Sequence, residues 1–162
     1  MPDGRTHEIL RQRFRPLSYM VVLGGAAALL PLDFKPWSEV FFGLGAFAGY
    51  EMGRYVTPDW DQMSTTDDES RMSREIPLLG HYLVGVSSMY GSFFRGWHRS
   101  IPTHFPGLST AGRHLLLFWW LWYQIWLSQI DLYWAIFFCL GLFSGNSISD
   151  TIHYLADLLY KE

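Results

Sequence analysis

The chain has 162 residues, of which 49% are hydrophobic and 18% aromatic, and its formal net charge is -3. This length predicts one domain. The small negative charge and the lack of a basic patch interleaved with aromatic residues argue against a nucleic-acid-binding protein. The single cysteine, Cys139, lies in an apolar stretch and cannot form an intrachain disulfide.

The charged residues are gathered into a few segments. Windows without Asp, Glu, Lys or Arg cover residues 16–32, 76–94, 114–130 and 132–149, and window 37–52 carries only Glu39 and Glu51 near its ends. A spanning helix needs about 20 apolar residues and tolerates about 17. Five such windows predict an integral membrane protein. A soluble bundle would instead need amphipathic windows, and window 114–130 is almost uniformly apolar.

The arginines predict the topology. Four of them precede residue 16, so the positive-inside rule holds the N-terminus in the cytoplasm. The stretch after Arg15 lacks a cleavage pattern and is expected to remain as the first span. Window 76–94 is rich in Gly and Ser and is predicted to be an interfacial or re-entrant helix. With that placement, eleven of the twelve Lys and Arg residues are cytoplasmic, and both termini lie inside.

We therefore predict an all-α integral membrane bundle of four transmembrane helices plus one interfacial or re-entrant helix. It forms a single domain, 1–162, with a polar cytoplasmic loop at 55–75 and a loop at 95–113. The expected partners are membrane lipids. The Trp-rich helix 114–130 is expected to fill the bundle or, as an alternative, to contact other membrane-protein subunits.

Imidazole and carboxylate groups occur in four separate segments. His98 and His104 flank a proline-containing turn, two carboxylates follow Pro58, His153 precedes Asp157 by one helical turn, and His7 lies near the start. These ligand types suit zinc, with manganese or iron as alternatives. If window 76–94 crossed the membrane, the groups would lie on opposite faces. Each also has a plain alternative: a solvated terminal histidine, an acidic turn, a basic interface loop, or a polar stripe formed by Asp150, His153 and Asp157.

The order of these motifs resembles a known family. The motifs are Gly4-Arg5-Thr6-His7, Pro58-Asp59-Trp60-Asp61, His98-Arg99-Ser100 followed by His104, and His153 with Asp157. They resemble the bacterial membrane-bound metal-dependent hydrolases, in particular their small "predicted metal-binding protein" branch, from Gly4 to Asp157. The resemblance implies a location in the bacterial inner membrane and a metal bound by His7, Asp59, Asp61, His98, His104, His153 and Asp157. Phe105 departs from the family's small residue after the second histidine and is expected to crowd an open coordination position.

Two functions follow as hypotheses. In the first, the protein is a metal-dependent hydrolase at the cytoplasmic face of the membrane, acting on a phosphoester or a lipid headgroup. Arg99 would neutralise a phosphate, and Asp61 would accept a proton from water. In the second, it is a non-catalytic integral membrane subunit of a larger energy-converting complex, with a structural or vestigial metal site. A closed coordination shell favours the second. His81 and His114 lack neighbouring carboxylates and are expected to be structural.

Overall fold

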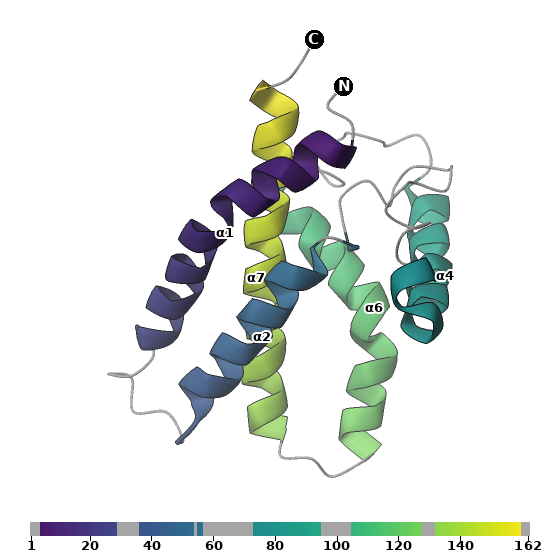
Figure 1. Ribbon diagram of the computed structural model, residues 1–162. Coiled ribbons are helices and arrows are strands. Elements are labelled where there is room, and N and C mark those ends of the chain that lie inside the picture. Colours follow the sequence, from purple (N-terminus) through teal and green to yellow (C-terminus); the bar gives the residue numbers. More distant parts are fainter. Residues whose placement is uncertain are drawn as a thin grey trace.

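The computed structural model describes residues 4–28, 36–53, 55–56, 73–94, 105–127 and 132–159, and these residues form helices with no strand among them. The main helices are α1 (Gly4–Ala27), α2 (Ser38–Met52), α4 (Pro77–Phe93), α6 (Leu108–Leu127) and α7 (Leu132–Leu159). The prediction of an all-α fold is confirmed. In Figure 1, α7 runs through the centre, with α1 and α2 on one side, α6 on the other and α4 beyond α6.

The long helices alternate in direction. The start of α1 and the end of α7 lie at one end of the molecule (Figure 1). The end of α1 and the start of α2 lie at the opposite end, as do the end of α6 and the start of α7. The helix predicted for window 76–94 is present as α4. The predicted loop at 95–113 ends earlier, because α6 begins at Leu108 and includes Arg113.

One of the described helices, α7, is long and apolar enough to cross a membrane. Four arginines (Arg5, Arg11, Arg13 and Arg15) precede the apolar half of α1. The 15 residues of α2 fall short of the span that a bilayer needs. Helix length and composition therefore support one membrane span, and they do not establish the predicted four.

The contact between α2 and α7 is made through glycine. Gly45 and Gly49 of α2 face Gly141 and Gly145 of α7. A Cβ added to Gly45 or Gly49 would fall on the carbonyl oxygen of Phe138 or Leu142, and one added to Gly141 or Gly145 on that of Phe42 or Ala46. Both helices thus carry glycines four residues apart, and the two backbones touch where a side chain would separate them. This small-residue spacing is common where membrane helices pack closely.

A polar contact fixes the first half of α1 against α2. The hydroxyl of Tyr50 donates to the backbone carbonyl of Arg11 at 2.8 Å, and the Arg11 guanidinium lies 5.4 Å from the centre of the Tyr50 ring. Tyr50 is fully buried and Arg11 nearly so. Because the hydroxyl and the ring bind the same residue, they hold this part of α1 across the end of α2.

Candidate functional site

Two of the predicted metal ligands lie together on α7. His153 Nε2 is 3.6 Å from Asp157 Oδ2, and the side chains are 9% and 14% exposed. Their spacing of four residues places both on one face of the helix. The predicted polar stripe is confirmed as a helical one, because Asp150 lies one turn earlier in α7 and is also buried. An imidazole and a carboxylate are therefore held side by side at the C-terminal end of α7.

A buried ion pair joins α6 to α7 next to this pair. Asp150 Oδ2 accepts hydrogen bonds from Arg113 Nη2 and from the hydroxyl of Thr110. The Arg113 side chain is 0% exposed and that of Asp150 is 2% exposed. Arg113 Nε and Nη1 make no hydrogen bond in the described part of the chain. Such a pair offsets its own desolvation cost only in part, so its presence points to a role in positioning α6 against α7.

The chain just after α2 is tied to the middle of α7. Asn146 Nδ2 donates to the backbone carbonyl of Val56 at 3.2 Å, and both residues are buried. Val56 packs with Leu83, Val86 and Tyr90 of α4. This anchor matters because Val56 comes three residues before Asp59 in the sequence.

The residue after His104 also contacts α7. The Phe105 ring lies edge-on to that of Tyr154, with 6.4 Å between the ring centres. Phe105 was expected to crowd a coordination position, and here its ring packs on the neighbour of His153 while remaining 52% exposed. Val56 and Phe105 each border a predicted ligand segment. Val56 contacts α7 at Asn146, before His153, and Phe105 contacts it at Tyr154, directly after His153.

The remaining predicted site residues are not placed. His7 lies in α1, but its side chain is not among those described. Asp59, Asp61, His98, Arg99 and His104 lie outside the described residues. Within the described residues, no group of three or more His, Cys, Asp or Glu side chains is positioned to hold a metal. The structure thus brings together two of the seven predicted ligands, and the seven-ligand site stays a prediction.

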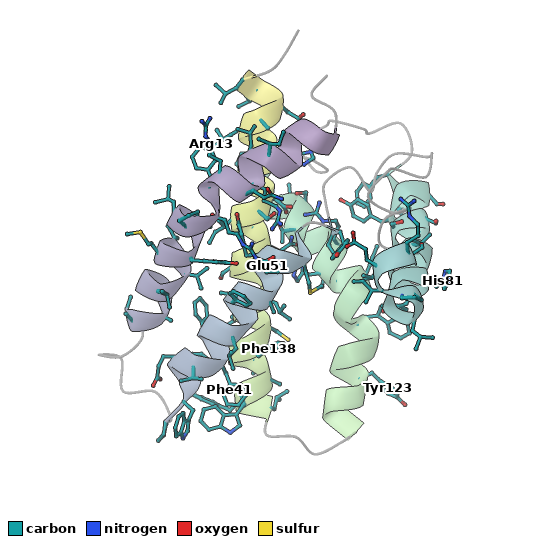
Figure 2. The ribbon with its side chains drawn as sticks, in the orientation of Figure 1. Arg13, Phe41, Glu51, His81, Tyr123 and Phe138 are labelled. Carbon is teal, nitrogen blue, oxygen red and sulfur yellow. The ribbon has the colours of Figure 1, made fainter. Side chains whose placement is uncertain are left out.

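The two histidines expected to be structural lie on helices other than α7, which carries this pair. His81 is exposed on α4 and points away from the other helices (Figure 2). His114 Nδ1 lies 2.9 Å from the Thr110 carbonyl, and its ring packs edge-on against Phe143.

Sequence reasoning missed two features around the site. Arg113 was assigned to a loop, and nothing near it in sequence signals that its partner is Asp150. The glycine contact did carry a signal: Gly45 with Gly49, and Gly141 with Gly145, repeat the small-residue spacing of close helix pairs. Reading that spacing would have paired α2 with α7.

Comparison of the chain with protein families, curated proteins and solved structures gives no match. The resemblance to membrane-bound metal-dependent hydrolases therefore stays a prediction from the motifs alone.

Proposed function

We propose that this protein is a membrane protein that binds a divalent metal ion at the C-terminal end of α7. The observation that carries the proposal is the pair His153 and Asp157, flanked on α7 by the anchors of Val56 and Phe105. The two anchored segments are those that carry Asp59, Asp61 and His104. We propose that groups far apart in the chain thereby meet at one region of α7.

Chain length supports this convergence. Asp59 follows Val56 by three residues, and an extended chain spans at most about 3.6 Å per residue, so the two Cα atoms are separated by no more than about 11 Å. His153 follows Asn146 by seven residues, which is about 10 Å along a helix. His104 is bonded directly to Phe105. These lengths allow imidazoles and carboxylates from the two segments to reach the ion that His153 and Asp157 would hold.

The donor set suits a hydrolytic ion. Nitrogen from His153 and oxygen from Asp157 are ligands that zinc accepts, and manganese and iron accept them as well. An ion bound there would supply Lewis acidity and an acidified water. The chain's own contribution is to hold His153 and Asp157 in one orientation, since Asp150 fixes the preceding turn of α7 to Arg113 of α6. We propose hydrolysis of a phosphoester or lipid headgroup as the activity, with Arg99 and Asp61 as the groups that act on substrate and water.

The membrane location rests on α7 and on the surface of its neighbours. α7 meets the length and polarity of a span, and its glycine contact with α2 has the spacing of membrane helix pairs. Large apolar side chains are exposed along the apolar half of α1 and along α2, including Met20, Leu23, Leu44 and Phe47. We propose that α1, α2, α6 and α7 cross the inner membrane, the short α2 being held there by its glycine contact with α7. Both termini and the metal site lie on the cytoplasmic side in this proposal.

The test is the metal content of the purified protein and of three variants. His153→Ala and Asp157→Asn should each lose most of the bound metal measured by elemental analysis, because each variant removes one of the two proposed ligands on α7. His81→Ala is the matched control, because it removes an exposed imidazole from α4, and it should keep the metal. Equal metal content in all four proteins would refute the site.

A second function is favoured by one observation. Trp119 and Tyr123 lie one turn apart on α6 and are 59% and 50% exposed, and Tyr123 projects outward in Figure 2. This stripe suits a contact with another membrane subunit, as expected for a non-catalytic member of a complex. Metal retained without hydrolysis of phosphoesters, together with co-purifying subunits lost in Trp119→Ala, would favour this function over the hydrolase.

A further inference from the structure

An apolar groove runs between α1 and α2. Its volume is about 510 Å³, and its walls are small or aliphatic side chains, among them Val22, Ala26, Gly43 and Leu44. The groove is lined at one end by Tyr19 and at the other by Ala27 and Glu39. It is therefore apolar along its length and polar at its ends.

The length of the groove suits one leaflet of a bilayer. Tyr19 and Ala27 are eight residues apart on α1, which corresponds to about 12 Å at the helical rise per residue. The hydrocarbon core of a bilayer is about 30 Å thick, so one leaflet provides about 15 Å. A single acyl chain lying along α1 would match these dimensions.

Positive charge is concentrated at the Tyr19 end. Arg15 Nε donates to the Tyr19 hydroxyl at 2.7 Å, and Arg15 Nη2 lies 2.9 Å from Glu51 Oε1. The hydrogen bond to Tyr19, followed by the one to Glu51, raises the pKa of Arg15. The Arg15 side chain remains 45% exposed. Arg11 and Arg13 lie on the same helix. Glu51 is one carboxylate beside two guanidinium groups, those of Arg11 and Arg15, so this end of the groove favours an anion.

We propose that the groove binds an anionic phospholipid, with an acyl chain between α1 and α2 and the phosphate beside Arg15. The apolar walls account for the tail and the exposed guanidinium for the headgroup. This proposal rests on the membrane location proposed above and is independent of the metal site.

The experiment measures lipid retention in detergent by native mass spectrometry, after incubation with equal amounts of phosphatidylglycerol and phosphatidylcholine. The wild type should retain the anionic lipid preferentially. Arg15→Gln should reduce that preference about fivefold, the effect of one basic residue near a phosphate. Gly43→Phe should reduce retention of both lipids at least tenfold, because a Cβ at Gly43 lies 3.6 Å from Ala26 and a larger side chain would extend into the groove.

Two matched controls separate the groove from a general effect. Arg13→Gln removes the same charge from a side chain that projects away from Glu51 (Figure 2), and Gly24→Phe adds the same ring where nothing lies within 4 Å. Both should retain lipid as the wild type does. Equal losses in Arg13→Gln and Arg15→Gln, or in Gly24→Phe and Gly43→Phe, would overturn the proposal. If the wild type fractionates with membranes but does not retain the anionic lipid preferentially, the lipid proposal fails and the membrane location stands. A wild-type protein found in the cytosol would refute both the lipid proposal and the membrane location.

Discussion

The two faces of α7 are built by opposite means. Toward α2 it presents glycines, so that backbone meets backbone without side chains between them. Toward α6 it presents Asp150, buried in contact with Arg113 and Thr110. The first face gains from close packing, while the second carries the desolvation cost of two charges. This difference teaches that the glycine face holds the helices together, and that the charged face is retained for what it positions.

The largest expected effect comes from breaking the charged face on one side only. Asp150→Ala leaves the Arg113 guanidinium buried without a counter-charge, which costs about 3–5 kcal/mol of unfolding free energy. Denaturation of the purified protein, followed by circular dichroism, would measure it. The double variant Arg113→Met with Asp150→Leu should recover most of that loss. A double variant as unstable as Asp150→Ala would mean that the ion pair itself holds α6 to α7.

A smaller effect is expected on the glycine face. In Gly145→Ala the new methyl group meets the Ala46 carbonyl and the Tyr50 backbone nitrogen, so α2 and α7 must separate at a cost of about 1–3 kcal/mol. The same denaturation measurement applies. Gly85→Ala is the control, since a Cβ there has nothing within 4 Å, and it should stabilise α4 by about 0.5–1 kcal/mol. Similar changes in the two variants would show that the α2–α7 contact is looser than described.

The smallest effect is expected outside both faces. Arg15 is partly exposed and pairs with Glu51 at the edge of α1 and α2, where solvent screens the interaction. Arg15→Gln should leave the melting temperature unchanged within error. A clear loss of stability would mean that the Arg15–Glu51 pair also holds α1 against α2. The lipid measurement on Arg15→Gln would then have to be interpreted together with that on Gly43→Phe.

The sequence predicted the positions of the helices better than the contacts between them. Clustering of charges marked the apolar segments, and the three-and-four spacing of Asp150, His153 and Asp157 correctly placed these residues together on one helix, α7. Helical periodicity could not reveal that Asp150 meets Arg113, 37 residues earlier in the chain. It also could not predict which carbonyl each glycine would touch. Pairings of this kind depend on how helices settle against each other, and the predicted ligands at 59–61 and 98–104 depend on segments outside the described helices.

The glycine face also has a consequence for biosynthesis. α2 is complete about 100 residues before α7 has been translated, which is roughly 5–20 s at about 5–20 residues per second. Throughout that interval the side of α2 that carries Gly45 and Gly49 has no α7 to pack against. Final assembly must therefore wait for the last helix to leave the ribosome, and chains truncated before α7 would present that uncovered side to quality-control proteases.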